Sequence, residues 1–312
     1  MISVIIPNYN HARFLKKRIE SVLAQSYKHF EIIILDDCSS DNSREVIELF
    51  RDHPAVSQII YNERNSGSAF RQWNKGVFAA KGDYVWIAES DDYAAPDFLT
   101  VLMTVMQGDP TIGLAYCDSY EIDERNQVMG RWSRWQSGLE GNLWLADFIA
   151  PGIKVNQAYN YAFNVIPNAS AVLFKKDAYL KSPFLHLIEQ LKFTGDWLMW
   201  FSILQVSAVF YCHQPLNYFR YHDATTRSDS MNRLQNVREH YQAILKLGRM
   251  VRRTNGGPLL KNKFRELYQA WNPALKNMLT QQNLAVLRFA LLTDKGITLK
   301  LLKTFLKKIH VI

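Results

Sequence analysis

Acidic side chains follow two hydrophobic runs in the first third of the chain. Ile32-Ile33-Ile34-Leu35 leads into Asp36-Asp37, and Tyr84-Val85-Trp86-Ile87 leads into Glu89-Ser90-Asp91-Asp92. Such apolar runs are typical of central strands in a parallel sheet, and these sheets bind ligands at the carboxyl ends of their strands. Acidic pairs that meet there repel each other unless a cation or a donor-rich ligand compensates them. The sequence therefore predicts a site for a metal ion and a polar, phosphorylated ligand.

The run from Glu89 to Asp92 is the stronger of the two signals. Alternate side chains of an extended segment point to the same side, so Glu89 and Asp91 share one side while Asp92 can turn toward the crevice. Oxygen ligands at this density favour Mg²⁺ or Mn²⁺. The alternative is a loop whose acids cap a helix that begins near Pro96.

The run from Asp36 to Asp41 also allows two interpretations. It can be a turn that caps the next helix. Alternatively, a carboxylate such as Asp37 can accept a hydrogen bond from the N–H of a pyrimidine base. No Gly-x-Gly-x-x-Gly and no Gly-Lys-Ser/Thr follows any of the strands, which argues against a dinucleotide-binding Rossmann domain and a P-loop.

These acids need a sheet to position them, and the first 117 residues predict one. Hydrophobic runs of strand length alternate with longer stretches of helical periodicity, the order of a doubly wound α/β fold. The expected strands cover residues 2–6, 31–35, 57–61, 83–88 and 112–117. The expected helices cover residues 12–25, 42–52, 68–80 and 96–107.

Residues 118–170 are less regular and rich in aromatic side chains. Glycine and proline interrupt the pattern, and the aromatic residues between them include Trp132, Trp135, Trp144, Tyr159 and Tyr161. Long aromatic loops often line a site, which is the favoured interpretation. A second small core is the alternative. A strand over 169–174 and an apolar helix over 196–206 are expected next, and further helices follow from residue 231.

Charge is unevenly distributed along the 312 residues. Residues 1–230 hold 21 Lys and Arg against 26 Asp and Glu, whereas residues 231–312 hold 16 against 3. Any basic partner surface is therefore expected in the C-terminal part. Nucleic acid is not an expected partner, because the predicted site is acidic and no nucleic-acid-binding motif accompanies the basic tail.

Cysteine usage and hydropathy suggest where the protein works. Cys38, Cys117 and Cys212 are odd in number and form no Cys-x-x-Cys pair, which argues against a disulfide framework and a zinc cluster and favours a reducing cytoplasm. No signal-peptide pattern precedes the first strand, and no apolar run approaches the ~18–20 residues of a spanning helix. We expect a cytoplasmic protein, with the inner face of the cell membrane as a second location.

Four stretches, in this order, resemble the family 2 inverting glycosyltransferases of GT-A fold. They are Val4-Ile5-Ile6-Pro7-Asn8-Tyr9-Asn10, Leu35-Asp36-Asp37-x-Ser39-x-Asp41, Asn65-Ser66-Gly67 followed by Asn74-Lys75-Gly76-Val77-Phe78-x-Ala80-Lys81-Gly82, and Glu89-Ser90-Asp91-Asp92. The match spans roughly residues 2–100. It implies a Rossmann-like, mostly parallel sheet flanked by helices, a nucleotide-sugar donor and a divalent cation, Mn²⁺ or Mg²⁺. It also implies transfer with inversion at the anomeric carbon, with a UDP- or dTDP-sugar as the preferred donor.

The resemblance assigns roles to individual residues. Those assigned to the nucleotide sugar are Pro7, Tyr9, Asn10, Asp37, Asn65, Gly67, Arg71 and Asp91. Pro7 and Tyr9 would lie against the base, and Asp37 on its edge. The residues assigned to the metal are Asp92, as the direct ligand, with Glu89 and His222. Glu89 departs from the family's commoner Asp, which keeps the charge on a longer side chain.

The acceptor side has its own candidates. Thr194-Gly195-Asp196-Trp197-Leu198-Met199-Trp200 resembles the family segment whose Asp is the catalytic base, with Gly195 in place of the frequent Glu. A carboxylate there can take the proton of the acceptor hydroxyl. The alternative for Asp196 is the N-cap of the following helix. Tyr218 to Ser228 resembles the family's closing segment, which places Arg220 or His222 near the diphosphate or metal. A structural role is the alternative for both, and the other histidines show no ligand spacing.

The C-terminal residues 297–312 read as a cationic amphipathic helix. Leu301, Leu302, Phe305, Leu306, Ile309 and Ile312 share one side, with lysines opposite. One interpretation is binding to an anionic membrane surface, which would bring the protein to a lipid-linked acceptor. The alternative is a helix that packs on the catalytic domain.

The sequence thus predicts a catalytic domain over residues 1–230 and a basic helical extension over 231–312. Within the first, residues 1–117 would bind the nucleotide sugar and residues 118–230 the acceptor. The expected activity is metal-dependent transfer of a sugar to a glycan or lipid-linked acceptor in surface-polysaccharide synthesis. The alternatives are a catalytically degenerate scaffold subunit and a sugar nucleotidyltransferase. The second should carry a Gly-rich basic loop after its first strand, and Asn8-Tyr9-Asn10-His11-Ala12-Arg13 is not one.

Overall fold

The computed structural model of the chain describes residues 1–136, 139, 142–166, 168–222 and 233–251, together with residues 299 and 303. The chain divides into two compact units. The first comprises Met1–Asn160 with Asn164–Thr225, and the second comprises Tyr161–Phe163 with Thr226–Ile312. The strands formed by the described residues all lie in the first unit.

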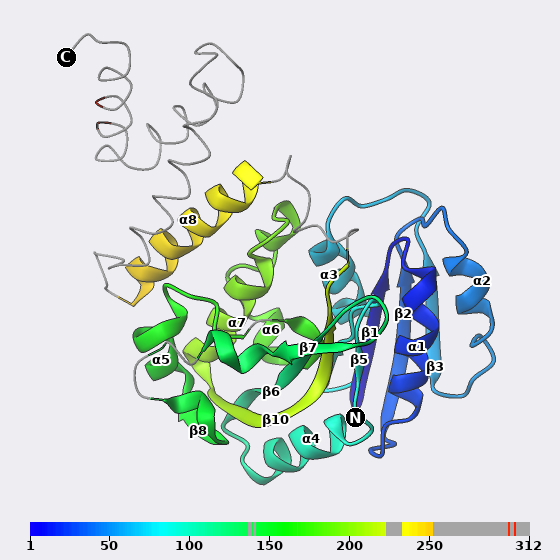
Figure 1. The fold of residues 1–312 in the computed structure, drawn as a ribbon, viewed down its shortest axis with the longest axis horizontal. Coiled ribbons are helices and arrows are strands. Elements are labelled where there is room, and N and C mark those ends of the chain that lie inside the picture. The colour runs from blue at the N-terminus through cyan, green and yellow to red at the C-terminus, as the bar shows by residue number, and fades with distance from the viewer. Residues whose placement is uncertain are drawn as a thin grey trace. The chain divides into compact units, whose positions relative to one another are not determined.

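One half of the sheet is parallel, as the sequence predicts. Its strands are β1 (Ile2–Asn8), β2 (Phe30–Asp36), β3 (Val56–Tyr61) and β4 (Tyr84–Ile87). They lie side by side in the order β3-β2-β1-β4, and each neighbouring pair is parallel (Figure 1). The carboxyl ends of β1, β2 and β4 therefore meet at one edge of the sheet.

The other half of the sheet is mixed. Its strands are β5 (Tyr93–Ala94), β6 (Ile112–Ile122), β7 (Val128–Arg131), β8 (Phe148–Pro151), β9 (Val172–Lys175) and β10 (Ala208–Arg220). β9 lies antiparallel between β4 and β6, and β10 runs parallel to β6 with two shifts of register after Cys212. The apolar run that becomes β9 predicts a strand, but its reversed direction depends on the path of the preceding segment, residues 118–171.

Helices cover both faces of the sheet (Figure 1). One face carries α1 (Ala12–Leu23), α2 (Ser43–Glu48) and α4 (Phe98–Gly108), and the other carries α3 (Ala69–Ala79), α6 (Lys176–Leu180) and α7 (Gly195–Val206). Alternation along β1 explains the two layers. Val4 and Ile6 belong to the core cluster that contains Leu15 of α1, whereas Ile5 points to α3, where a Cβ on Gly76 would lie 2.4 Å from it.

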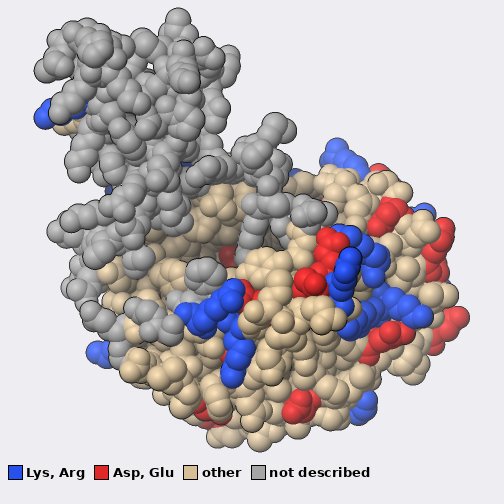
Figure 2. Space-filling model, viewed as in Figure 1, with Lys and Arg blue, Asp and Glu red and all other residues tan. Residues whose placement is uncertain are grey.

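Figure 2 shows acidic and basic side chains interspersed on one face of the described surface. They do not gather there into one large patch of a single sign. A surface of this kind does not by itself favour a polyanionic partner such as nucleic acid.

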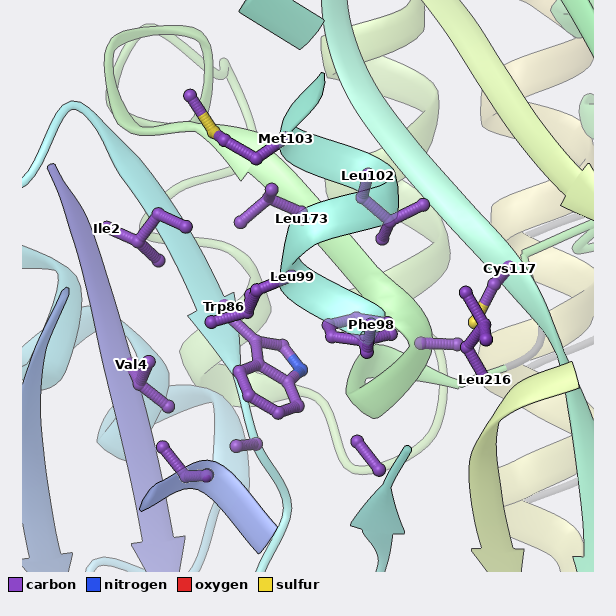
Figure 3. Close-up of a cluster of buried hydrophobic side chains, with 14 of the residues drawn as sticks. Ile2, Val4, Trp86, Phe98, Leu99, Leu102, Met103, Cys117, Leu173 and Leu216 are labelled. Carbon is purple, nitrogen blue, oxygen red and sulfur yellow. The ribbon is translucent and has the colours of Figure 1, made fainter. Parts of the chain in front are cut away.

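A large apolar cluster fills the space between the sheet and α4 (Figure 3). Trp86 of β4 is fully buried, and its ring lies 4.6 Å from that of Phe98. The indole N–H of Trp86 donates to Ser170 O at 2.8 Å, so its one polar atom is satisfied. Burial of each such side chain contributes about 1.5–3 kcal/mol. This core gives the acidic end of β4 a rigid base.

The aromatic stretch contains a second small core, the alternative considered from the sequence. It includes the short helices η1 (Trp132–Trp135), η2 (Leu143–Leu145), α5 (Gly152–Val155), η3 (Asn156–Asn160) and η4 (Ala169–Ala171), and η5 (Ile188–Gln190) follows β9 and α6. Trp144 is buried, and its ring contacts those of Phe148 and Tyr159. Its indole N–H donates to Tyr116 Oη at 2.6 Å. These aromatic side chains stabilise the stretch rather than present rings to a ligand.

In the second unit, α8 (Arg233–Met250) is the helix whose bounds are described. No helix among the described residues is long and apolar enough to cross a membrane. The amphipathic helix expected over residues 297–312 lies outside the described residues, apart from residues 299 and 303. The domain boundary expected at residue 230 stays a prediction.

Candidate active site

The loops after β1 and β2 are joined by side-chain hydrogen bonds. Asn8 Nδ2 donates to Asp36 Oδ1 at 2.9 Å, and Ser39 donates to both oxygens of the same carboxylate. Asn10 accepts from the Ser40 N–H at 2.8 Å and donates its own N–H to Ser39 Oγ. Asn10 adopts a positive φ of 56°, which asparagine tolerates better than most residues. In the structure, Asp36 and Asn10 fix the loops that border the sheet edge.

Asp37 is buried and saturated by donors from the chain itself. Oδ1 accepts from Asn62 Nδ2 at 2.6 Å and Gln72 Nε2 at 2.9 Å. Both oxygens accept from the Ser66 N–H, and Oδ2 also accepts from Ser66 Oγ at 2.7 Å. A carboxylate offers about four lone-pair sites, so these bonds leave no free direction for a base. The role on the base edge stays a prediction, whereas the structure shows Asp37 organising the loop after β3.

Of the other residues assigned to the nucleotide, Pro7 and Tyr9 lie at the end of β1, and Asn65, Gly67 and Arg71 lie in or beside the loop after β3. Tyr9 follows β1 with 47% of its surface exposed, whereas Pro7 is buried within the strand. Asn65 Oδ1 accepts from the Gly67 N–H at 2.7 Å, and Gly67 has a φ of +75° that favours glycine. Arg71 Nη1 donates to the backbone of the same loop at 2.8 Å. Tyr9 and Arg71 are thus accessible, while Asn65 and Gly67 shape the turn.

A hollow of about 720 Å³ opens beside the loop after β3. It is lined by residues 61–66 with Arg71 and Lys75. Arg64, Arg71 and Lys75 bring three positive charges to it against the one negative charge of Glu63. This balance suits an anionic or carbonyl-rich ligand.

At the end of β4, a carboxylate meets two imidazoles. Asp91, His11 and His222 each present a ligand atom within 4.8 Å of the other two. His222 Nε2 lies 3.0 Å from Asp91 Oδ2, and His11 Nδ1 lies 2.9 Å from Ser90 Oγ. His222 Nδ1 is buried, and the described residues offer it no hydrogen-bond partner. A carboxylate and two imidazoles whose ligand atoms lie this close together fit a divalent cation.

The three acids of this segment differ in ionisation. Burial opposes the charge on Asp91, but the hydrogen bond with His222 and the proximity of His11 hold the pKa of Asp91 at about 2. Burial and the neighbouring Asp91 raise the pKa of Glu89 to about 8 and that of Asp92 to about 7. The hydrogen bond with His222 and the proximity of both imidazoles thus favour the charged form of Asp91, the form that a cation would meet.

The structure does not bring Asp92 and Glu89 into this cluster. Asp92 Oδ1 accepts from the Arg220 N–H at 2.9 Å, and Glu89 Oε1 accepts from Trp73 Nε1 at 2.8 Å. Both carboxylates are thus engaged away from the imidazoles. His222 lies in the cluster, as a metal-ligand candidate should. The carboxylate in the cluster is that of Asp91, whereas the sequence favoured Asp92. The assignment of Asp92 as direct ligand stays a prediction that the hydrogen bonds do not favour.

Arg220 has a structural position. Its guanidinium donates to Asp91 O at 2.7 Å, to Asp123 O at 2.8 Å and to Asn126 Oδ1 at 2.8 Å. Its Cζ lies 4.5 Å above the ring of Phe14. With its donors engaged, Arg220 joins the acidic segment to the turn between β6 and β7, the alternative to a diphosphate contact.

A second arginine lies beneath the acids. Arg18 of α1 is fully buried, and its Nε donates to Glu89 O at 2.8 Å. Its two terminal nitrogens have no hydrogen-bond partner among the described residues. Burial lowers the pKa of Arg18 to about 10, and Asp92, Asp91 and Glu89 oppose a larger fall. Arg18 is therefore the buried counter-charge of the cluster.

Asp196 lies in the first turn of α7. The N-cap position belongs to Thr194, so the capping alternative for Asp196 is wrong, although an acid in this turn still suits the helix dipole. Asn164 Nδ2 donates to Asp196 Oδ2 at 3.2 Å, while Asn164 Oδ1 accepts from the Ile166 N–H. A Cβ on Gly195 would lie 2.6 Å from the ring of Phe70. That contact explains why this chain has glycine before the acid.

Sequence reasoning missed four residues that touch the site. His11 has no second ligand nearby in the sequence at metal-binding spacing. It does follow β1, which is parallel to β4. A histidine at the carboxyl end of a strand beside the acidic segment was the signal that could have identified it. Arg18, Trp73 and Asn164 belong to helical or irregular segments with no such signal. Only the packing of α1, α3 and the 118–170 stretch reveals them.

Comparisons with known proteins identify the family and the fold of the chain. A family model described as Glycosyl transferase family 2 matches residues 3–164. An uncharacterised glycosyltransferase of Rickettsia typhi is 28% identical over 247 residues, which cover 79% of this chain and 72% of that protein.

Among solved structures, Staphylococcus aureus TarS (residues 1–349) has a TM-score of 0.62 at 17% identity, over 95% of this chain and 82% of that one. TarS has also been solved with UDP and with UDP-GlcNAc. The mannosyltransferase PcManGT of Pyrobaculum calidifontis, in complex with GDP-Man and Mn²⁺, has a TM-score of 0.53 at 16% identity, over 97% and 78% of the two chains. Likenesses at these identities show a shared GT-A fold.

Proposed function

Because the chain belongs to glycosyl transferase family 2 and has the GT-A fold, we propose that it is a metal-dependent inverting enzyme. It moves a sugar from a nucleoside-diphosphate sugar to a hydroxyl group of a glycan or lipid-linked acceptor. The observation that carries the proposal is the cluster of ionised Asp91, His11 and His222 at the carboxyl edge of the sheet. Such an edge is where α/β folds bind their ligands.

The donor is a nucleoside diphosphate linked to a sugar. The exposed ring of Tyr9 offers a surface on which a base can stack, and Arg71 and Lys75 bring positive charge to the hollow beside the loop after β3. The two structural neighbours were solved with UDP-GlcNAc and GDP-Man respectively. A UDP- or dTDP-sugar is the donor we favour for this chain, with specificity among bases arising from the loop that Asp37 holds.

Asp91, His222 and His11 are the residues that would hold a divalent cation. Two nitrogen ligands and one carboxylate favour Mn²⁺ over Mg²⁺. When bound, such a cation offsets the negative charge that develops on the departing diphosphate. Asp92 and Arg220 hold the Asp91 segment in place through the hydrogen bond between the Arg220 N–H and Asp92 Oδ1.

Asp196 is the catalytic base of the proposal. Its carboxylate takes the proton from the acceptor hydroxyl while that oxygen forms a bond to the anomeric carbon. The bond from the anomeric carbon to the diphosphate oxygen breaks on the opposite face, and its electron pair leaves with the nucleoside diphosphate. The transition state resembles an oxocarbenium ion, and a single displacement inverts the anomeric configuration. Asn164 orients the carboxylate for this step.

Calorimetric titration tests the donor class and the metal site together. The purified chain is titrated with UDP, dTDP, GDP and CMP, each with and without Mn²⁺. We expect Mn²⁺-dependent binding of one diphosphate in the wild type and its loss in Asp91→Asn, because the ionised ligand is removed. Asp92→Asn should retain the Mn²⁺ dependence, since an amide oxygen can still accept from the Arg220 N–H.

Asp177→Asn is the matched control, because Asp177 is an exposed carboxylate that pairs with Lys181, just after the end of α6. Binding lost in Asp92→Asn and kept in Asp91→Asn would restore Asp92 as the direct ligand. Binding of no nucleotide by the wild type would argue for a catalytically degenerate scaffold.

The base is tested by Asp196→Asn. We expect transfer to fall by about 10²–10⁴-fold, because the proton acceptor is lost, while nucleotide affinity stays the same. The measurement is turnover of the donor that calorimetry identifies, beside its dissociation constant. Near-normal turnover would remove Asp196 from the mechanism.

A lipid-linked acceptor would bring the protein to a membrane surface. The basic residues 231–312 and the amphipathic pattern of 297–312 support this part of the proposal. Cosedimentation with liposomes that contain anionic lipid should depend on residues 297–312. Unchanged cosedimentation after their deletion would count against membrane binding through this segment.

A further inference from the structure

The indole of Trp73 connects two parts of the site. Trp73 lies on α3 and is 3% exposed, and its N–H donates to Glu89 Oε1 at 2.8 Å. Glu89 begins the segment that ends in Asp91 and Asp92. An aspartate at position 89 would place its carboxylate about 1.5 Å closer to the backbone, one C–C bond short of this contact. The unusual glutamate therefore has a geometric reason, which is its reach to α3.

The other side of Trp73 faces the helix of the base. Its ring centroid lies 5.9 Å from that of Trp200 on α7 and 5.0 Å from that of Phe70. The Phe70 ring in turn fills the space beside Gly195, at 2.6 Å from the position of a Cβ. Two aromatic side chains of α3 thus pack on the first two turns of α7, the part that carries Asp196.

We propose that Trp73 is a positioning residue that holds the helix of Asp196 in register with the Asp91 segment. The inference rests on the proposed function, which gives Asp196 and Asp91 their roles. Trp73 bonds Glu89 and packs on α7. A displacement needs its reacting atoms about 3–3.5 Å apart, and a shift of 1 Å can cost about 100-fold in rate. A single buried side chain bonded to one segment and packed on the other restrains that distance.

Trp73 could instead be an ordinary core residue, and four variants distinguish the two roles. Trp73→Phe keeps the ring packing and removes the N–H. Glu89→Asp withdraws the acceptor, whereas Glu89→Gln keeps an oxygen that can accept from the indole. Trp144→Phe is the matched control, because Trp144 is also buried and donates one hydrogen bond, to Tyr116, outside the site.

The first measurement is hydrogen exchange in peptides that cover residues 194–206 of the full-length protein without ligand. We expect faster exchange in Trp73→Phe and Glu89→Asp, and wild-type exchange in Glu89→Gln and Trp144→Phe. Trp73→Phe combined with Glu89→Asp should exchange no faster than either alone, because both changes break one bond. Unaltered exchange in Trp73→Phe, or equal acceleration in Trp144→Phe, would overturn the inference.

The second measurement is the turnover of UDP-GlcNAc with Mn²⁺, scored as transfer to water. Trp73→Phe and Glu89→Asp should lower kcat about 10-fold or more with the donor KM within about twofold, since misalignment affects the reaction and not the binding of the donor. A KM effect with unchanged kcat would contradict a positioning role. A wild-type protein without turnover would count against UDP-GlcNAc as the donor, and hydrogen exchange would then decide the coupling by itself.

Discussion

The acidic ends of β2 and β4 look alike in the sequence and differ in the structure. At the end of β2, Asp36 and Asp37 accept hydrogen bonds from side chains and backbone of the neighbouring loops. At the end of β4, Asp91 faces two imidazoles, and the guanidinium of Arg18 lies beneath it with unpaired terminal nitrogens. The carboxylates after β2 have their hydrogen-bonding capacity filled by the protein itself. After β4, the carboxylate of Asp91 keeps lone pairs that a ligand can use.

The difference teaches how to interpret carboxylates at strand ends. A saturated carboxylate stabilises loops, because removing it leaves buried donors without partners. A buried carboxylate whose charged form is favoured by neighbouring imidazoles can still offer lone pairs to a ligand, and perturbed pKa values of this kind are typical of functional sites. The number of donors around each acid separates the two cases, and residue type does not.

The largest effect is expected from Asp91→Asn at the β4 end. Loss of the ionised ligand removes several kcal/mol of charge stabilisation, so kcat/KM should fall at least about 10³-fold. The thermal midpoint should fall modestly, because the lowered pKa of Asp91 means that the folded state favours its ionised form. Kinetics and thermal denaturation of the same preparation measure both. Retained activity with a large loss of stability would mean that the β4 end resembles the β2 end after all.

The next largest effect is expected from Arg18→Met, which should lower the free energy of unfolding. The substitution leaves Asp91, Asp92 and Glu89 without their buried counter-charge, which typically costs about 3–5 kcal/mol. Urea denaturation at pH 7 measures the loss. Arg51→Met is the control, because Arg51 pairs with Glu48 in an exposed ion pair that contributes little to stability. Equal losses in the two variants would show that the acids do not depend on Arg18.

Asp37→Ala tests the saturated end. It leaves the buried donors of Ser66 and Gln72 without an acceptor, so we expect a loss of about 1–3 kcal/mol. The Mn²⁺ dependence of nucleotide binding should persist. If stability is unchanged while the affinity for the nucleotide collapses, Asp37 reads the base directly, as the family resemblance implies.

The smallest effect concerns Glu31, at the opposite end of β2. Burial would raise its pKa, but hydrogen bonds from Ser3 and the Lys81 N–H outweigh this and lower it. A lowered folded-state pKa means that the contribution is present above the unfolded pKa of about 4.3 and is lost as pH falls through the folded value.

Glu31→Gln should therefore remove about 1 kcal/mol or less at pH 7 and flatten the decline in stability below about pH 4.3. Denaturation at a series of pH values measures the slope. If the variant loses stability at low pH as steeply as the wild type, Glu31 does not contribute to the acid-induced loss of stability.

The sequence predicts the parallel half of the fold well. Continuous apolar runs and their spacing define β1 to β4 within a few residues, because buried parallel strands leave a strong local signal. The order and direction of β9 and β10 depend on contacts between distant segments. The local hydrophobic pattern of the sequence does not indicate which distant segments pair.

For the candidate site, local motifs in the sequence indicate which segments the fold brings together. Motifs indicated which segments matter, and residues such as Asp91, His222 and Asp196 lie where those segments meet the sheet edge or α7. The choice between Asp91 and Asp92 depended on which carboxylate the Arg220 N–H occupies. Arg220 belongs to β10, which is more than 100 residues from this segment in the sequence. His11, Arg18 and Trp73 needed the packing of helices on the sheet before they could be seen.

The reach of β10 also has a consequence for biosynthesis. Asp91 and His222 are separated by 131 residues, and the strand that delivers the histidine is the last one of the first unit. At a synthesis rate of 5–20 residues per second, about 7 to 26 s pass between the two residues on the ribosome. During this interval the nascent chain contains Asp91 and His11 but lacks His222. The cluster of these three residues therefore cannot assemble until almost the whole first unit has been translated.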